Sequence, residues 1–334
     1  MKKICLLVLI SLLAILVGCN QQDETNVVKP NEEEPTLPND SNDSNLLAHW
    51  KFQNIEGCYT GNIENDDLTF IDLSGNGNDM VVASEGLGKK LDVFSWDIGV
   101  SGEGSTSLKM NNTLALAESV DPYDKSDNTY SGAYVSGKYL ETVDSAPLNM
   151  IDEEFWTIEV VFKISTDWNN SYNRYTGIFS RQHVSEIHDE PYFSMAMAAV
   201  ESDDTIEGAI GEDTLIGLQF LHIDENSKSN REFSEIKANQ WIYYMVVGNY
   251  EGIKIYVNGQ LVESISNKNC KFNMSYNAIG WEVGVGRKYG EGANTMNIRH
   301  PEGLIRRLFC GSISEIRFSS KNLTIEESLF YQSR

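Results

Sequence analysis

The fold is decided by residues 242–264, which read IYYMVVGNYEGIKIYVNGQLVES. β-Branched and aromatic residues fill two segments, 242–247 and 253–257, and their alternation is typical of half-buried strands. Asn258-Gly259 then leads directly into a third segment. Asn-Gly between alternating segments favours a type I′ turn, because both of its central residues need a positive φ. The stretch therefore predicts three consecutive antiparallel strands.

The same strand pattern recurs along the chain after residue 45. Long helical patterns are absent, so the sequence predicts an all-β fold, a two-sheet antiparallel β-sandwich or jelly roll. Residues 84–145 are rich in Gly, Ser, Asp and Tyr and are expected to be an insertion that decorates one edge. One short helix is expected at the end, where Thr324 and Glu327 fit a capping box. The other predicted strands are 47–52, 156–163, 175–181, 192–200, 215–223 and 281–287.

The N-terminus carries an export signal. Lys2 and Lys3 precede an apolar run from Ile4 to Val17, which is too short to span a bilayer comfortably. Gly18-Cys19 closes this run and resembles a bacterial lipobox, which implies removal of residues 1–18 and acylation of Cys19. An ordinary secretory signal with a chance cysteine is the alternative. We expect an outer-membrane lipoprotein exposed on the cell surface, with the periplasmic face as the alternative.

Residues 19–45 are predicted to form a disordered acidic tether. They consist largely of Asn, Asp, Glu, Pro, Thr and Ser, and cannot bury enough surface to fold. Asn20 and Asp23-Glu24 resemble the leader of surface lipoproteins in Bacteroidetes-type bacteria. The whole chain has 49 acidic and 26 basic residues and a net charge of −23. This charge opposes nucleic acid and anionic lipid heads, so the expected membrane contact is the lipid anchor alone.

Three cysteines remain once Cys5 leaves with the signal and Cys19 is acylated. They are Cys58, Cys270 and Cys310, an odd number that cannot pair completely within one chain. A disulfide between Cys270 and Cys310 is compatible with an extracytoplasmic compartment. Buried free thiols are an equal alternative.

The order of motifs resembles a known family of β-sandwiches. Trp50 and Phe52 end the first predicted strand, and Asp-Leu-Ser-Gly-Asn-Gly-Asn follows at 72–78. The Val-Asn-Gly hairpin comes later, and 311–318 form the last strand. This order is similar to that of the laminin-G-like, concanavalin A-like lectin/glucanase jelly rolls of bacterial surface proteins. The resemblance implies one sandwich domain over residues 46–334, in a fold that hosts lectins, glucanases and protein-binding modules.

The resemblance also implies one structural Ca²⁺ between the first and last strands. Asp72, Asn78 and Glu315 are the expected ligands, because Ca²⁺ prefers carboxylate, amide and carbonyl oxygens. Gln53 and Ser314 depart from the family pattern, since acidic residues are expected at both positions. The alternative is that Asp72 makes an Asx-type turn and binds no metal.

Catalytic carboxylates are not evident in the sequence. Glucanases of the resembling family use Glu-x-Asp-x-x-Glu on one strand, with two carboxyl groups about 5 Å apart, and this triplet does not occur here. His183 and the His-Asp-Glu run at 188–190 are not accompanied by a nucleophile motif, so we interpret them as a polar loop. The sequence predicts a protein that is not an enzyme, with a glycoside hydrolase of atypical carboxylates as an alternative.

Aromatic side chains in polar loops are the candidates for sugar binding. Their rings can stack on the apolar face of a pyranose while neighbouring polar groups bind its hydroxyls. Alternatively, each ring folds down over the edge of the sandwich. The sequence predicts a lectin-like lipoprotein that binds a neutral glycan, with a protein-binding adhesion module as the alternative. The candidate binding residues are Trp168, Asn169, Tyr172, Arg174, Tyr130 and Tyr134.

Overall fold

The computed structural model describes one part of the chain. It covers residues 43–332 except 66, 86–91, 114–115, 117–136, 151–152, 170–172, 174–175, 185–190, 202–214, 224–228, 267–277 and 288–305. The chain divides into two units, Met1–Leu37 and Pro38–Arg334, and every described residue belongs to the second. The predicted signal, Cys19 and most of the tether lie outside the described residues. Within the described ranges, no helix has the length and apolar character needed to cross a membrane.

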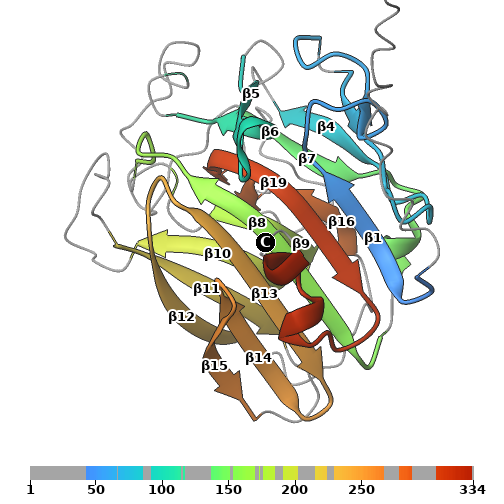
Figure 1. The fold of residues 1–334 in the computed structure, drawn as a ribbon, viewed down its shortest axis with the longest axis vertical. Helices are drawn as coiled ribbons and strands as arrows, with labels where there is room; N and C mark the ends of the chain where they lie inside the picture. The colour runs from blue at the N-terminus through green and yellow to red at the C-terminus, as the bar shows by residue number, and fades with distance from the viewer. Residues whose placement is uncertain are drawn as a thin grey trace, which may run out of the picture. The chain divides into compact units, whose positions relative to one another are not determined.

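Two antiparallel sheets build this unit, which confirms the predicted sandwich (Figure 1). Sheet A has the order β15-β14-β13-β8-β19-β6-β5, and β1 also pairs with β19. Its strands are β1 (Leu46–Lys51), β5 (Phe94–Gly99), β6 (Gly102–Asn111), β8 (Trp156–Ile164), β13 (Trp241–Asn249), β14 (Gly252–Val257), β15 (Gln260–Ile265) and β19 (Cys310–Ser319).

Sheet B has the order β12-β11-β10-β9-β16-β7-β4-β3-β2. Its strands are β2 (Tyr59–Thr60), β3 (Thr69–Phe70), β4 (Met80–Glu85), β7 (Gly137–Thr142), β9 (Thr176–Val184), β10 (Pro191–Glu201), β11 (Leu215–Ile223), β12 (Ser229–Lys237) and β16 (Ala278–Val283). A separate ribbon pairs β17 (Val285–Arg287) with β18 (Arg306–Leu308), and a short 3₁₀ helix, η3, spans Pro147–Met150.

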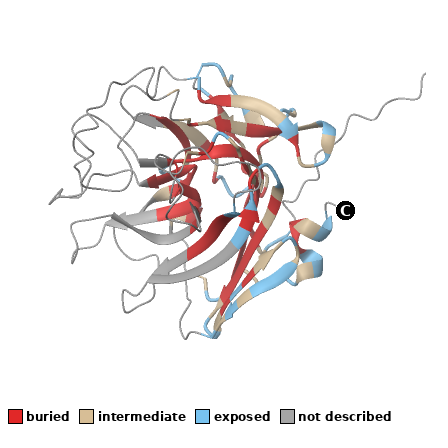
Figure 2. Ribbon diagram, turned by 90° about the vertical axis from the view of Figure 1, so that its left-hand side faces the viewer, coloured by how far each residue is buried: buried red, intermediate tan, exposed pale blue. Residues whose placement is uncertain are grey.

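The core lies between the facing sheets and is rich in aromatic rings (Figure 2). Trp50 of β1 contacts Phe179 of β9, with ring centroids 6.0 Å apart. Phe179 stacks on Trp281 of β16 at 4.8 Å, and Trp281 meets Phe318 of β19 edge-to-face at 5.3 Å. These rings alternate along their strands with residues of the opposite face, so the period of two fixes which side chains fill the core.

The opening hairpin stretch folds as predicted. Strands β13, β14 and β15 pair in sequence. Asn258 has a φ of 50° and Gly259 a φ of 78°, the two positive values that a type I′ turn requires. Gly259 is also needed for space, because a Cβ at this position would lie 2.4 Å from the Phe330 ring.

The expected insertion at residues 84–145 is wrong in part. This region supplies β5 and β6 to sheet A and β7 to sheet B, where β7 pairs with β4 on one side and β16 on the other. Tyr139 and Leu140 of β7 are buried in the core. Gly and Ser in the first half of β6 have low strand propensity, so the sequence does not indicate a strand there. Hydrogen bonding to the neighbouring strands holds this segment in the sheet.

The predicted strand at 281–287 is two strands in the structure. Gly284, with a φ of 86°, separates β16 from β17. The capping box at the C-terminus is confirmed, because the Thr324 N–H donates to Glu327 Oε2 at 2.9 Å. It starts the 3₁₀ helix η4 (Ile325–Glu327), which is followed by α3 (Leu329–Gln332). We refer to residues 322–332 as the C-terminal segment, and it lies over the outer face of sheet A (Figure 1).

Candidate functional site

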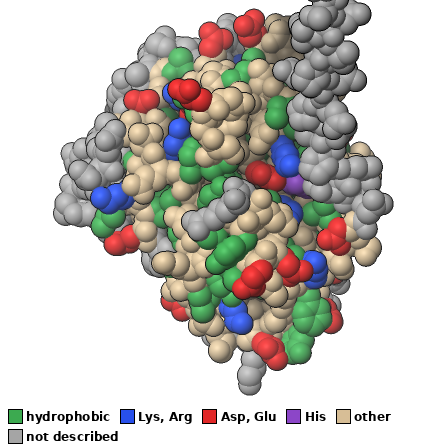
Figure 3. Space-filling view, in the orientation of Figure 1, with side chains coloured by type: hydrophobic (Ala, Val, Ile, Leu, Met, Phe, Trp, Pro, Cys, Tyr) green, Lys and Arg blue, Asp and Glu red, His purple; other side chains and the backbone are tan. Residues whose placement is uncertain are grey.

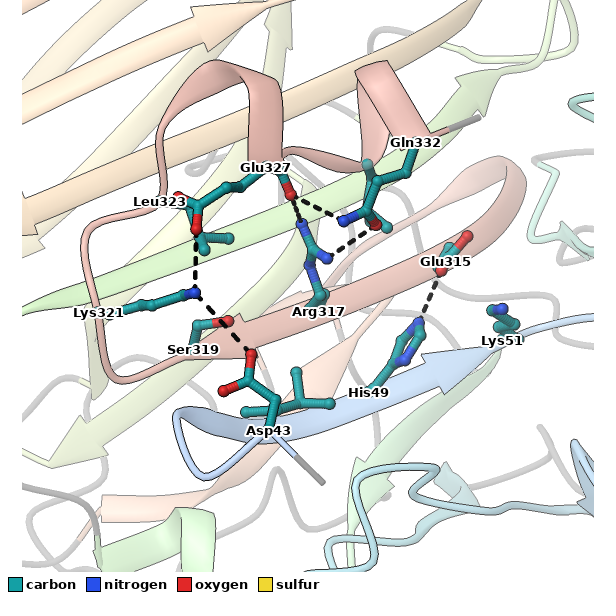
Figure 4. A pocket seen from close by; sticks show the side chains of 12 residues that line it. Asp43, His49, Lys51, Glu315, Arg317, Ser319, Lys321, Leu323, Glu327 and Gln332 are labelled. Atoms are coloured by element: carbon teal, nitrogen blue, oxygen red, sulfur yellow. Dashed lines mark hydrogen bonds and ion pairs between the residues drawn. The ribbon is translucent and has the colours of Figure 1, made fainter. Parts of the chain in front are cut away.

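An open groove on the outer face of sheet A is the candidate site (Figures 3 and 4). It has a volume of about 600 Å³ and lies between β1, β19 and the C-terminal segment. In Figure 3 a histidine lies among acidic and basic side chains on this face. We refer to this feature as the β1–β19 groove.

The alternation of β1 and β19 supplies the polar side chains of the groove. Trp50 is fully buried in the core, so its neighbours His49 and Lys51 project from the opposite face of β1. The antiparallel register places Arg317 of β19 opposite His49, and Glu315 opposite Lys51. Four polar or charged side chains from two strands therefore meet in one patch.

His49 orients the Glu315 carboxylate. Its Nε2 donates to Glu315 Oε1 at 2.6 Å, and the two side chains are 4% and 17% exposed. The His49 backbone N–H donates to Asp72 Oδ1 at 3.0 Å, which fixes β1 behind the imidazole. Within the described residues, the second oxygen of Glu315 accepts no hydrogen bond. Glu315 thus presents an acceptor of fixed orientation at the groove.

Lys51 is the cationic counterpart of this acceptor. Although it stands opposite Glu315 in the strand register, it makes no hydrogen bond or ion pair in the part of the chain that the structure describes (Figure 4). Burial raises the pKa of the Cys58 thiol, the positive charge of Lys51 opposes this shift, and the negative charge of Glu315 adds to it. Both charges therefore act on the same buried thiol.

Arg317 forms hydrogen bonds that fix the C-terminal segment at one side of the groove. Its Nε donates to Glu159 Oε2 at 2.6 Å, and its Nη1 donates to Gln332 Oε1 at 3.0 Å. The Leu329 N–H donates to the other oxygen of Glu159 at 2.7 Å. Burial raises the pKa of Glu159, and the charge of Arg317 and the bond from Leu329 oppose that shift. The C-terminal segment is thereby fixed to β8 and β19.

The exposed rim of the groove carries a weaker ion-pair group. Lys321 Nζ lies 3.2 Å from Glu327 Oε1 and 3.9 Å from Asp43 Oδ2. These side chains are a third to a half exposed, so solvent screens them and they hold the rim loosely. Lys51 and Glu315 are therefore the groove charges best placed to meet a ligand.

The predicted calcium ligand Asp72 is occupied by hydrogen-bond donors. Asp72 Oδ1 accepts hydrogen bonds from the His49 N–H, the Ser74 N–H and the Ser74 hydroxyl, at 2.7 to 3.0 Å. Asp72 Oδ2 accepts two more from the backbone and side chain of Asn78, at 3.0 and 2.9 Å. Both oxygens are thus occupied by donors, and Asp72 makes the turn given above as the alternative.

Asn78 Oδ1 and one of the two Glu315 oxygens are occupied as well. The Leu148 N–H donates to Asn78 Oδ1 at 2.7 Å, and Glu315 binds His49. Among the described residues, no group of three His, Cys, Asp or Glu side chains could hold a metal ion. These contacts stabilise the fold and do not by themselves form a calcium site, so calcium binding stays a prediction.

Trp168 is the main correction to the predicted sugar site. Its side chain is fully buried in the core, so the ring offers no face to a sugar. Asn173, five residues further on, is buried as well, and its side-chain amide donates to the carbonyls of Asn112 and Leu308 at 2.9 and 2.7 Å. Asn169 is half-buried in the same loop. The candidates that lie outside the described residues are Tyr172, Arg174, Tyr130 and Tyr134.

The two cysteines within the described residues, Cys58 and Cys310, are free thiols, as in the alternative given above. Cys310 is a buried free thiol, against the predicted disulfide with Cys270, which lies outside the described residues. Burial raises the pKa of Cys310 to about 12. Cys58 is likewise buried and free.

Sequence reasoning missed most of this groove. A signal was present, because the alternation around Trp50 already assigns His49 and Lys51 to the outer face. Glu159 stands among apolar residues in its strand, so the sequence around it indicates no partner. Its partner Arg317 is 158 positions away, so only the pairing of β8 with β19 brings the two together.

Comparisons with known proteins show similar structures but no family. No family model matches the chain, and no curated protein matches it. Domain 4 of AbnA, a GH43 extracellular arabinanase from Geobacillus stearothermophilus in complex with arabinotriose, is 13% identical, with 86% of this chain and 97% of that chain covered and a TM-score of 0.47.

Two further structures were also solved with a saccharide. The Ruminococcus gnavus IT-sialidase CBM40 bound to α2,3-sialyllactose is 14% identical over 56% of this chain and 89% of that one, with a TM-score of 0.35. Trypanosoma rangeli sialidase in complex with sialic acid is 10% identical over 86% of this chain and 33% of that one, with a TM-score of 0.45. These scores do not identify a family, so the functional argument rests on the chain's own residues.

Proposed function

We propose that this chain is a non-catalytic glycan-binding lipoprotein whose β1–β19 groove binds a neutral saccharide. Cys19 would carry the acyl chains that hold it at the outer surface of the cell, with residues 20–45 as the tether. The observation that supports binding is the Lys51–Glu315 pair. The two side chains are directly opposite in register, open to the same groove and not bonded to each other.

This pair suits a vicinal diol. One sugar hydroxyl can accept a hydrogen bond from the Lys51 ammonium, and the neighbouring hydroxyl can donate one to Glu315. Hydrogen bonds to charged groups are shorter and stronger than neutral ones. His49 already holds Glu315 in place, so little side-chain entropy is lost on binding. A neutral ligand is favoured because the net charge of −23 repels polyanions.

The same contacts support our proposal that this groove binds a saccharide and does not cleave it. A retaining glycosidase needs two carboxyl groups about 5 Å apart, both free to reach the sugar. Both oxygens of Glu159 are bonded to Arg317 and Leu329, beneath the C-terminal segment. Glu315 is held by His49. The other acids of the groove, Asp43 and Glu327, lie at its exposed rim beside Lys321.

A glycan array with purified variants tests the proposal. The mature chain is applied to neutral and acidic saccharides, and the best ligand is then titrated by calorimetry. Lys51→Met and Glu315→Gln should each weaken binding about 10- to 100-fold, the usual effect of losing a charge-assisted hydrogen bond. Lys237→Met, a matched loss of charge at an exposed position of β12 in sheet B, should change nothing.

Three results would contradict the proposal. Unchanged affinity in both groove variants would remove the site. If no saccharide binds while a surface protein does, the chain is an adhesion module, and if saccharides are hydrolysed it is an enzyme.

A further inference from the structure

A second hollow lies next to the β1–β19 groove on the outer face of sheet A. It has a volume of about 450 Å³ and lies between β13, β14, β15 and the C-terminal segment. Hydrogen-bonding side chains line it, among them Glu251, Lys254, Ser264 and Asn322. Leu323 borders both hollows, so they are adjacent across one residue of the C-terminal segment. We refer to this feature as the β13–β15 hollow.

The boundary between the two hollows is firmly held. Leu323 packs on Met245 and Val247 of β13. Its N–H donates to Thr157 Oγ1 at 3.0 Å, and the Thr157 hydroxyl donates to the Lys321 carbonyl at 2.7 Å. The Leu323 backbone therefore forms a fixed ridge, and a ligand that extends from one hollow to the other must pass over it.

The ridge also carries an unused acceptor. Asn322 Oδ1 is buried and has no hydrogen-bond partner among the residues that the structure describes, although Asn322 as a whole is half-buried. A buried acceptor without a partner costs free energy, which a donating group of a ligand would recover after a small rotation of the amide. Hydroxyl groups of a saccharide are such donors.

An exposed aromatic pair lies beyond the hollow. The rings of Phe155 and Tyr250 meet edge-to-face with centroids 5.7 Å apart, and these residues are 41% and 52% exposed. Phe155 precedes β8 by one residue, so alternation places it on the same side of the strand as Thr157, under the ridge. The register of β8 with β13 brings Phe155 beside Asn249, which borders the β13–β15 hollow.

The turn that carries Tyr250 is internally braced. Asn249 Oδ1 accepts hydrogen bonds from the Glu251 N–H at 2.7 Å and the Gly252 N–H at 3.2 Å. A braced turn holds an exposed ring with little loss of entropy on binding, which favours it as a stacking surface.

We propose that the outer face of sheet A binds an extended oligosaccharide chain and not only a single terminal sugar. One sugar unit binds Lys51 and Glu315 in the β1–β19 groove, the chain crosses Leu323, and later units fill the β13–β15 hollow and stack on Tyr250 and Phe155. This inference rests on the proposed function. A peptide is less suited to this surface, because protein interfaces centre on apolar pockets that exclude water, whereas polar and charged side chains share the lining of both open hollows with the apolar ones.

Calorimetry with a length series tests the inference. The best ligand from the array is used as its mono-, di-, tetra- and hexasaccharide. Affinity of the wild-type chain should rise with length until both hollows are filled. Tyr250→Ala and Phe155→Ala should weaken the hexasaccharide about three- to tenfold and leave the monosaccharide unchanged. Tyr250→Phe should retain the wild-type affinity, since stacking needs only the ring.

The controls separate this inference from the proposed function. Tyr331→Ala removes another exposed tyrosine, 47% exposed, and should have no effect at any length. Wild-type affinity that does not depend on length, or Tyr250→Ala that binds the hexasaccharide normally, would overturn the extended site and leave the groove intact. Normal binding of every length by Lys51→Met would overturn both. Binding of a protein and of no saccharide, lost in Tyr250→Ala, would overturn both in favour of an adhesion surface.

Discussion

Replacement of Arg317 by methionine should cost about 3–5 kcal/mol of stability, the usual effect of removing one partner of a buried ion pair. Glu159 and Arg317 have side chains that are only 4% and 12% exposed, so solvent cannot take over the lost contacts. The substitution leaves the Glu159 carboxylate buried with one backbone donor, the Leu329 N–H. It also removes the bonds that Arg317 makes to Gln332 and to the Glu327 carbonyl.

The loss should depend on pH in a defined direction. Burial raises the pKa of Glu159, so the native state binds this proton more tightly than the unfolded chain does. Stability therefore falls as the pH rises from the usual glutamate pKa, about 4.3, through the raised native value, and returns on acidification. Without Arg317 the native pKa should be higher still. The cost of Arg317→Met should thus be smaller at pH 5 than at pH 7.

Urea denaturation followed by tryptophan fluorescence measures this effect. The set comprises the wild type, Arg317→Met, Glu159→Gln and the double variant, at both pH values. The double variant should be more stable than the sum of the two single losses predicts, because no charge is left buried. Lys321→Met, which breaks the exposed pair at the rim, should cost about 0–1 kcal/mol. A loss below about 1 kcal/mol for Arg317→Met, or one that does not change with pH, would refute the reasoning.

Three further predictions concern the fold. Trp168→Ala should cost about 3–5 kcal/mol by calorimetric or chemical unfolding, because the ring is fully buried, and it should leave glycan affinity intact at temperatures where the variant is folded. Asp72→Asn should cost about 1–3 kcal/mol, and the loss should be the same with chelator and with added calcium; a loss seen only with calcium present would restore the metal site. Gly248→Ala should lower the melting temperature, since its Cβ would lie 2.1 Å from the Trp156 ring.

Strands with strong local signals could be predicted from the sequence. The stretch 242–264 contains its own pattern, turn and register, because its partners are adjacent in the chain. Strand β6 could not be found in this way, since the Gly and Ser of its first half give no strand preference. One of its partners, β5, is adjacent in the chain, but the other, β19, is about 200 positions away. The break at Gly284 depends on a positive φ, which the alternation of residues 281–287 does not reveal.

The site was harder to predict than the fold for a related reason. Trp168 and Tyr250 both occur in polar turns, so their local sequences predict similar surface roles. Asn173, near the buried Trp168, donates to the Asn112 carbonyl in the interior, whereas Asn249 accepts a hydrogen bond from the Glu251 N–H within the exposed turn of Tyr250. The distinction depends on which carbonyls or amides each asparagine reaches. In the groove, His49 and Glu315 are 266 positions apart and meet only through the pairing of β1 with β19.

A crystal structure with the tightest saccharide from the array tests the central claim most directly. The account predicts sugar hydroxyls within hydrogen-bond distance of Lys51 Nζ and of the free oxygen of Glu315, with the His49–Glu315 contact unchanged. A saccharide bound instead on sheet B, with the β1–β19 groove filled only by solvent, would contradict it.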